Sequence, residues 1–276
     1  MVGRSIWRSL RVVEHLTTGA LIALYVSLRY RRDGRPEWLP TVTSWWHARL
    51  CAALGIEISV RGRLEPGCLL VANHISWLDI PIIGGQGEIG FLSKAEVRTW
   101  PLIGWMAEIA GTLFIARGGN QTLNIASRIA GLLASGRTLV IFPEGTTTDG
   151  SEVLRFHPRL FGIAQDAGPR IQPVAIGYHQ GSDPRPETRA AYIGEDTLVA
   201  SLWRILRHPN LVADIQLLEP IQADANESRR ALAERTHAAI LGALDPVRGE
   251  RKQTPEETPN TCIEEMDLEP RPAFIP

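Results

Sequence analysis

The sequence has little of what builds several familiar kinds of site. Its 276 residues include only three cysteines, which stand far apart and form no C-x-x-C pair. This argues against a disulfide framework and a zinc site, and favours a reducing compartment. The formal net charge is −1, so the overall charge gives no indication of nucleic-acid binding. No G-x-S-x-G motif occurs, so the nucleophile elbow of the serine hydrolases is absent.

The sequence also lacks a long, clean hydrophobic run. The apolar segment Leu16 to Tyr30 would reach roughly 22 Å as a helix, whereas a bilayer core is about 30 Å thick. Arginines flank the segment, and seven of the eight tryptophans, which favour membrane interfaces, lie in the first 105 residues. With a second amphipathic segment at Thr41 to Leu54, we expect a membrane-associated helical hairpin. A tilted span, a signal peptide and a buried helix are the alternatives.

After this hairpin, short apolar strands alternate with helices. Strands are predicted at 56–60, 69–72, 90–92, 112–116, 138–142, 171–176 and 212–218, and helices at 100–110, 123–134, 158–167 and 228–244. This alternation predicts an α/β domain with a largely parallel sheet flanked by helices. We therefore expect membrane-anchoring helices at 1–54, the α/β domain at 55–246 and a disordered, acidic, Pro- and Glu-rich tail at 247–276.

The segment NHISWLD contains the first pattern with recognisable chemistry. His74 follows an apolar strand, whose end a parallel sheet delivers to the edge where ligands bind. Asp79 comes five residues later, after a turn in which Ser76 would cap a helix. The carboxylate can then orient one imidazole nitrogen and leave the other to accept a proton. We expect a catalytic base and its partner, acting on a hydroxyl of the substrate; a structural histidine is the alternative.

Polar residues follow two more strands. In FPEGT, a buried strand leads into Glu144, Gly145 and Thr146, and such a turn can present N–H groups and a hydroxyl to an anion. GTLFIAR ends in Arg117, whose fork of donors suits a phosphate, and Lys94 follows another strand. We expect these groups at one edge of the sheet, with FPEGT on a strand next to that of Arg117. A plain turn and a surface salt bridge are the alternatives.

Together these segments resemble the glycerolipid acyltransferases of the PlsC type, the 1-acylglycerol-3-phosphate acyltransferases. Four blocks of that family are readable within residues 45–245: NHxSxxD, GxxFIxR, FPEGT and the strand QPVAI. The resemblance implies that His74 is the general base oriented by Asp79. It also implies that Arg117 and the FPEGT residues bind the glycerol phosphate of the acceptor, beside a wall shaped by Pro173.

The resemblance implies transfer of a fatty acyl group to the sn-2 hydroxyl of 1-acylglycerol-3-phosphate, giving phosphatidic acid. The acyl donor would be acyl-CoA or acyl carrier protein, and no cofactor is expected. No metal ion is expected either, because the His, Cys and carboxylate residues do not have the spacing of metal ligands. The expected partners are the lysophospholipid, the acyl donor and the bilayer, but no nucleic acid. The expected location is the cytoplasmic face of the inner membrane.

Thr147 departs from the family pattern, because many members carry arginine directly after FPEGT. Acylation of another lysolipid, such as lyso-ornithine lipid or lysophosphatidylcholine, is therefore an alternative. A non-catalytic lipid-binding protein and a hydrolase are two further alternatives.

Overall fold

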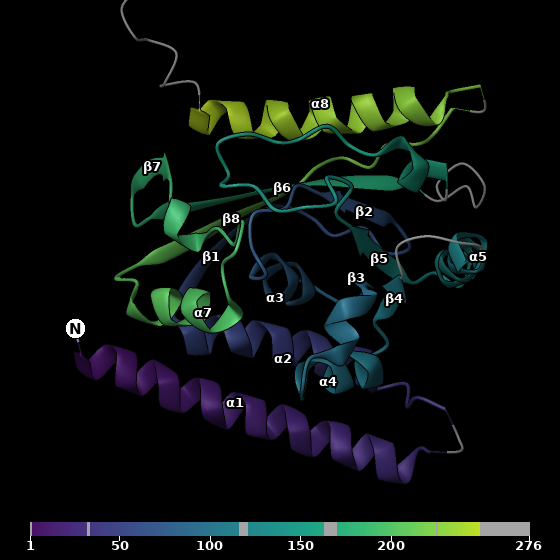
Figure 1. Ribbon diagram of the computed structural model, residues 1–276. Helices are drawn as coiled ribbons and strands as arrows, with labels where there is room; N and C mark the ends of the chain where they lie inside the picture. Colours follow the sequence, from purple (N-terminus) through teal and green to yellow (C-terminus); the bar gives the residue numbers. More distant parts are fainter. Residues whose placement is uncertain (1, 32–33, 116–120, 163–169, 225, 249–276) are drawn as a thin grey trace, which may run out of the picture.

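A mostly parallel sheet forms the centre of the computed structural model (Figure 1), which describes residues 2–31, 34–115, 121–162, 170–224 and 226–248. Among these residues the sheet has eight strands, in the order β1-β8-β6-β2-β5-β3-β4, with β7 paired to β6. The strands are β1 Ile56–Gly62, β2 Leu69–Ala72, β3 Ile89–Lys94, β4 Leu113–Ile115, β5 Thr138–Ile141, β6 Ile171–Gln180, β7 Asp183–Pro186 and β8 Leu211–Leu217.

The strands that carry the predicted site run in one direction. β2 pairs in parallel with β5 and β6, and β3 pairs in parallel with β5 and β4, so the carboxyl ends of these strands share one edge. β8 runs antiparallel to β6 and parallel to β1. The predicted fold class is confirmed. One expectation is wrong, because β3 lies between β4 and β5 and separates the GTLFIAR strand from the FPEGT strand.

Helices cover both faces of this sheet (Figure 1). They are α1 Val2–Arg29, α2 Leu39–Leu54, α3 Asp79–Gly84, α4 Ile103–Ala110, α5 Gln121–Ala134, α7 Leu198–Arg207 and α8 Arg229–Arg248, with 3-10 turns η1 Ala95–Thr99, η2 Pro158–Phe161 and η3 Thr188–Ala190. One hydrophobic core joins the sheet to α2, α3 and α7, and a second joins it to α5 and α8. β2 and β5 are wholly buried, as strands covered on both faces must be.

Helix α1 forms an outer layer, packed against α2, α4 and α7. It begins at Val2, well before the predicted Leu16. A row of large apolar side chains on α1 is 46–73% exposed, and we call it the α1 apolar row: Ile6, Trp7, Leu10, Val13, Leu21, Leu24, Tyr25 and Leu28. Among the described residues, no helix has the length and apolar character that a bilayer-crossing segment requires.

Several elements differ from the sequence prediction. Helix α7 and strand β7 were not predicted, and α3 was expected only as a helix capped by Ser76, without bounds. The helix expected at 158–167 is described only as the short turn η2. Helix α8 continues to Arg248, into the start of the predicted tail. The rest of that tail lies outside the described residues.

Candidate active site

The two residues predicted to form a base and its partner meet at the end of β2. His74 Nδ1 lies 2.7 Å from Asp79 Oδ2. Asp79 is the first residue of α3 and is fully buried, whereas the His74 side chain is 20% exposed. The carboxylate thus binds one imidazole nitrogen, and the ring still reaches solvent. The ring of Phe142 stacks on the imidazole, with 4.1 Å between ring centroids.

The Asp79 carboxylate accepts three further hydrogen bonds. The backbone N–H groups of Ile75 and Ser76 donate to Oδ2 at 2.7 and 3.0 Å, and the Tyr178 hydroxyl donates to Oδ1 at 2.5 Å. These donors satisfy a carboxylate that water does not reach. The expectation that Ser76 caps a helix is wrong, because its Oγ is buried without a hydrogen-bond partner in the described part of the chain.

Glu144 fixes the backbone of His74. Glu144 is only 4% exposed. Its two carboxylate oxygens accept hydrogen bonds from the backbone N–H groups of His74, at 2.7 Å, and Leu154, at 2.8 Å. Burial raises the pKa of Glu144, while these two N–H donors act in the opposite direction. The carboxylate therefore ties the turn after β2 to the turn after β5.

The remaining FPEGT residues lie at the surface of the same edge. Gly145, at φ +71°, has the left-handed conformation that glycine adopts without strain, and its N–H donates to the Phe142 carbonyl. Gly145 and Thr146 are both exposed. Thr147 donates its hydroxyl to the carbonyl of Tyr192, on the loop between η3 and α7.

Three other predicted residues are placed less directly. Lys94 is the last residue of β3, so its backbone lies at the carboxyl edge of the sheet. Pro173 is buried within β6, opposite Val71 of β2. Arg117 lies outside the described residues. Within the described residues, no cluster of His, Cys, Asp and Glu could hold a metal ion.

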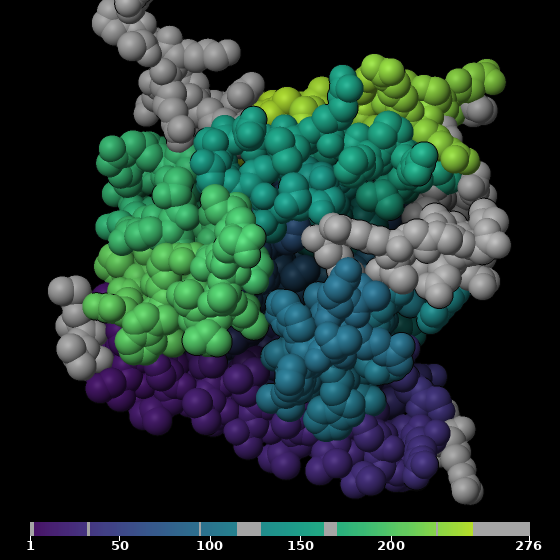
Figure 2. Space-filling model, in the orientation of Figure 1, coloured from purple at the N-terminus to yellow at the C-terminus, as the bar shows by residue number. Residues whose placement is uncertain are grey.

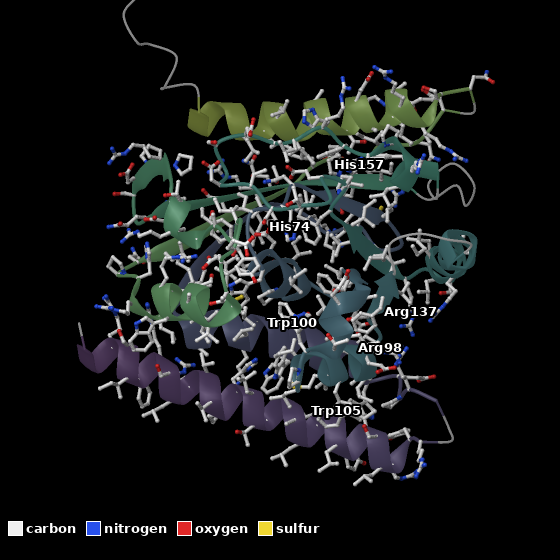
Figure 3. All side chains as sticks on the ribbon, viewed as in Figure 1. His74, Arg98, Trp100, Trp105, Arg137 and His157 are labelled. Carbon is white, nitrogen blue, oxygen red and sulfur yellow. The ribbon has the colours of Figure 1, made fainter. Side chains whose placement is uncertain are left out.

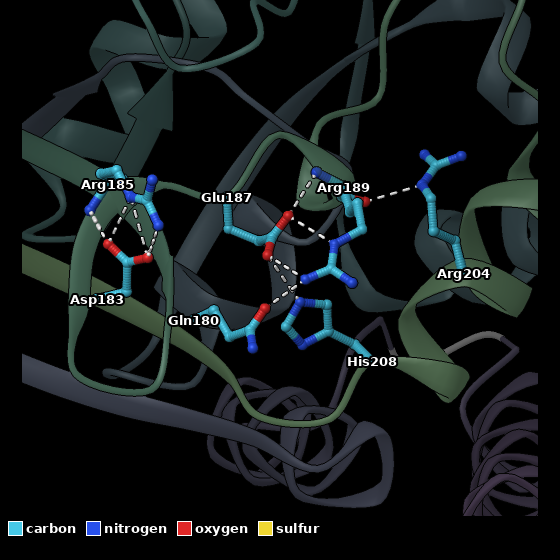
Figure 4. A network of polar contacts seen from close by, with 7 residues as sticks. All are labelled: Gln180, Asp183, Arg185, Glu187, Arg189, Arg204 and His208. Carbon is cyan, nitrogen blue, oxygen red and sulfur yellow. Dashed lines mark hydrogen bonds and ion pairs between the residues drawn. The ribbon is translucent and has the colours of Figure 1, made fainter. Parts of the chain in front are cut away.

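A network of charged side chains holds the loop that carries Tyr192 (Figure 4). Glu187 pairs with Arg189 at 2.5 Å and with His208 at 3.0 Å, and hydrogen bonds from Arg189 lower the pKa of Glu187 to about 2. Arg204 donates to the Arg189 carbonyl at 2.8 Å. The N–H of Tyr192 in turn donates to the carbonyl of Ile75 at 3.0 Å, which fastens the loop beside the His74 turn.

Comparison with known proteins establishes the family. The acyltransferase family model matches residues 55–177. The lyso-ornithine lipid O-acyltransferase of Pseudomonas aeruginosa is 44% identical over 254 residues, which cover 90% of this chain and 98% of that protein. The chain belongs to the PlsC-type acyltransferase family. The Brucella abortus lyso-ornithine lipid O-acyltransferase is 35% identical to this acyltransferase, over 83% of this chain and 94% of that one.

A relative named for a different acceptor and, separately, a solved crystal structure agree with this assignment. The 1-acyl-sn-glycerol-3-phosphate acyltransferase of Neisseria gonorrhoeae is 34% identical to the acyltransferase, over 70% of this chain and 76% of that one. The crystal structure of PlsC from Thermotoga maritima has a TM-score of 0.65 at 20% identity, and the match covers 90% of this chain and 95% of that one. This likeness shows that the two proteins share a fold.

The surface of the acyltransferase is hollowed in front of this edge. In Figure 2 the hollow lies between α7 in green, α4 in blue and the teal segment after β5. Figure 3, in the same orientation, places His74 in this part of the view, with Trp100 on the blue segment below it. The His74 side chain is 20% exposed, so its imidazole is accessible from solvent.

Sequence reasoning missed Tyr178, because strand β6 was predicted to end at Ile176 but runs to Gln180. Val174, Ile176 and Tyr178 all belong to the core that faces α3. Their spacing of two residues is the signal that could have extended the strand and placed the tyrosine on the same face as its neighbours.

Proposed function

We propose that this acyltransferase transfers a fatty acyl group to the hydroxyl of a lyso-ornithine lipid. The observation that carries the proposal is the 44% identity to the P. aeruginosa lyso-ornithine lipid O-acyltransferase, over 90% of this chain. The N. gonorrhoeae 1-acyl-sn-glycerol-3-phosphate acyltransferase is less similar, at 34% over 70%. Similarity over most of the chain thus favours the alternative acceptor over the one implied by the sequence motifs.

Thr147 supports this choice of acceptor. The ornithine headgroup is zwitterionic, because an ammonium group balances its carboxylate, whereas 1-acylglycerol-3-phosphate presents a phosphate with net negative charge. An arginine at position 147 would add a planar fork of donors suited to phosphate. Thr147 instead directs its hydroxyl to the carbonyl of Tyr192 and carries no charge. A neutral residue at this position suits an acceptor without a phosphate.

In the proposed reaction, His74 is the general base. With Nδ1 bound to Asp79, Nε2 is the nitrogen that takes the proton of the acceptor hydroxyl. The hydroxyl oxygen attacks the thioester carbonyl, the carbon–sulfur bond breaks, and the proton passes to the leaving thiolate. The donor would be acyl-CoA or acyl carrier protein, and no step uses a cofactor. Holding both substrates in the hollow would supply much of the rate.

Glu144 would support this reaction without touching the acceptor. Both of its oxygens accept backbone N–H groups, one of them from His74. We therefore assign it a positioning role, in place of the acceptor-binding role implied by the family resemblance. Gly145 and Thr146 are exposed at the same edge and stay candidates for contact with the acceptor.

The α1 apolar row supports attachment to a membrane surface. Its side chains share one side of a 28-residue helix, and Trp7 among them is 62% exposed. Exposed tryptophan and aliphatic side chains favour the boundary between headgroups and acyl chains. We propose that α1 lies in the plane of one leaflet, and that the acyltransferase works at the cytoplasmic face of the inner membrane.

A panel of acceptors tests the proposed function. The purified enzyme is supplied with one acyl-CoA and with lyso-ornithine lipid, 1-acylglycerol-3-phosphate or lysophosphatidylcholine, and ester formation is measured. We expect the highest kcat/KM for lyso-ornithine lipid, and loss of turnover by roughly 10²–10⁴-fold in His74→Ala. Thr147→Arg should raise the relative rate with 1-acylglycerol-3-phosphate. A wild-type preference for that phosphate acceptor would refute the proposal, and free fatty acid without ester would indicate a hydrolase.

A further inference from the structure

We propose that Tyr178 is a positioning residue for the catalytic pair, because its buried hydroxyl holds the Asp79 carboxylate at the angle that His74 requires. The inference rests on the proposed function, in which His74 is the base. The Tyr178 hydroxyl donates to Asp79 Oδ1 at 2.5 Å, and Tyr178 is only 4% exposed. None of the four family blocks read in the sequence includes this residue.

The two carboxylate oxygens are held in different ways. Oδ2 accepts from His74 Nδ1 and from two backbone N–H groups, those of Ile75 and Ser76. Oδ1 accepts from Tyr178, its one hydrogen-bond donor in the described part of the chain. Because both oxygens lie off the bond to Cβ, any turn of the carboxylate about that bond moves Oδ1 and Oδ2 together. The Tyr178 donor on Oδ1 therefore adds to the three donors on Oδ2 in resisting that turn, and it helps to keep the direction in which Oδ2 meets the imidazole.

The backbone around Tyr178 places the hydroxyl with little freedom. The Asn73 side chain accepts from the Ile176 N–H at 2.8 Å and donates to the Ile176 carbonyl at 2.9 Å. These two hydrogen bonds between the Asn73 amide and the Ile176 backbone join the end of β2 to β6, two residues before Tyr178. Since alternate residues of a strand share a face, Tyr178 points to the same side as Ile176, where Asp79 lies.

The hydroxyl also acts on the charge of the pair. Burial, followed by the negative charge of Asp79, raises the pKa of Tyr178 well above its usual value, so the hydroxyl keeps its proton and stays a donor. In the described structure, Asp79 and Cys51 act electrostatically on Tyr178, and a pocket beside Tyr178 is also lined by Asp149, His179, Glu187 and Asp214. A donor on Asp79 spreads the carboxylate charge, which limits how strongly Asp79 favours a protonated imidazole.

Tyr178→Phe removes the hydroxyl and keeps the ring. We expect kcat to fall by on the order of tenfold, the factor equivalent to a weak hydrogen bond to a charged group. The KM values for both substrates should stay within about twofold. The acidic limb of the rate profile should move to higher pH, because a carboxylate with one donor fewer holds the imidazolium more tightly. In an Asp79→Asn background, the same substitution should have less than half of its effect on log kcat.

Two controls make the result specific. Thr236→Val removes another fully buried hydroxyl, which donates within α8 to the Leu232 carbonyl, and it should leave kcat and the pH profile unchanged. Incorporation of 3-fluorotyrosine at position 178 gives a stronger donor and should move the acidic limb to lower pH, which tests the idea even if Tyr178→Phe does not fold.

Three outcomes would overturn the proposal. The first is wild-type kcat and pH profile in Tyr178→Phe while His74→Ala is inactive. The second is a loss of kcat that is equal in the wild-type and Asp79→Asn backgrounds, which would indicate a structural role. The third is an acidic limb that 3-fluorotyrosine leaves in place or moves upward. An active His74→Ala would instead refute the proposed function itself, so the two failures can be told apart.

Discussion

Replacement of Glu144 by glutamine should damage stability and turnover together. Glutamine keeps one oxygen, but its NH₂ group then faces one of the two backbone N–H groups that the carboxylate now accepts, at His74 or Leu154. Two donors would meet in a site that is only 4% exposed. A lost hydrogen bond to a charged group costs roughly 1.5–3 kcal/mol. The neutral amide escapes the burial cost of a carboxylate, so we expect the lower part of this range, about 2 kcal/mol.

This free-energy loss can be measured by thermal unfolding and by turnover. For a chain of this size, each kcal/mol corresponds to roughly 2–4 °C in Tm, so Glu144→Gln should lower Tm by about 4–8 °C. Displacement of the His74 backbone should lower kcat by roughly 10- to 100-fold, with little change in acceptor KM. Glu152→Gln, at an exposed position of the same loop, makes the same chemical change and should have neither effect.

The pH dependence of stability gives an independent check on Glu144. Burial raises its pKa in the folded protein above its ordinary value of 4.5, so between these two values the folded state binds more protons than the unfolded state. The stabilisation from this group is complete below pH 4.5 and declines as the pH rises through the folded pKa. The difference in unfolding free energy between wild type and Glu144→Gln should therefore shrink from pH 4.5 to pH 8. An unchanged kcat with a raised acceptor KM would refute this reasoning and favour direct contact between Glu144 and the acceptor.

Two further predictions concern α1. Burial lowers the pKa of His15 from 6.5 to about 4. The free energy of unfolding should therefore fall by about 3 kcal/mol as the pH drops from 6.5 to about 4. His15→Phe should remove this pH-dependent loss, which urea unfolding at several pH values would measure. Leu10→Glu with Leu21→Glu in the α1 apolar row should shift the enzyme from sedimented anionic vesicles to the supernatant. Ala231→Glu with Ala238→Glu, on the exposed side of α8, is the matched control; equal sedimentation of both variants would refute the membrane-surface proposal.

Much of the fold could be predicted from the sequence because its signals are local. The strand LLVA is apolar at every position, as a strand buried on both faces must be, and the structure has a strand at these same residues, Leu69–Ala72. The order of the strands is a different matter. Whether β3 lies between β4 and β5 depends on how connecting helices pack, and no residue within β4 records that position. For this reason the prediction that the FPEGT and GTLFIAR strands are neighbours was wrong.

In the candidate site, too, features fixed by local sequence could be predicted, whereas features that depend on tertiary packing could not. Asp79 could be assigned to His74 because five residues and one turn separate them, and a local turn fixes their distance. The role of Glu144 could not be predicted in this way. A carboxylate beside an exposed turn reads as a ligand-binding group, and only the folded structure shows that the His74 and Leu154 backbones occupy its two oxygens. Tyr178 lies 99 residues from its partner, so its contribution depends wholly on tertiary structure.

Helix α2 links the proposed membrane surface to the proposed base. α1 packs on α2, and α2 packs on α3, whose first residue is Asp79. The α1 apolar row and the His74–Asp79 pair consequently lie on the same side of the sheet, while α8 covers the other side (Figure 1). An acceptor whose acyl chain stays in the bilayer would need to bring only its hydroxyl-bearing end into the hollow. The arrangement therefore accounts for a base that is 20% exposed in an enzyme whose substrate is a lipid: a small opening suffices when the rest of the acceptor remains in the membrane.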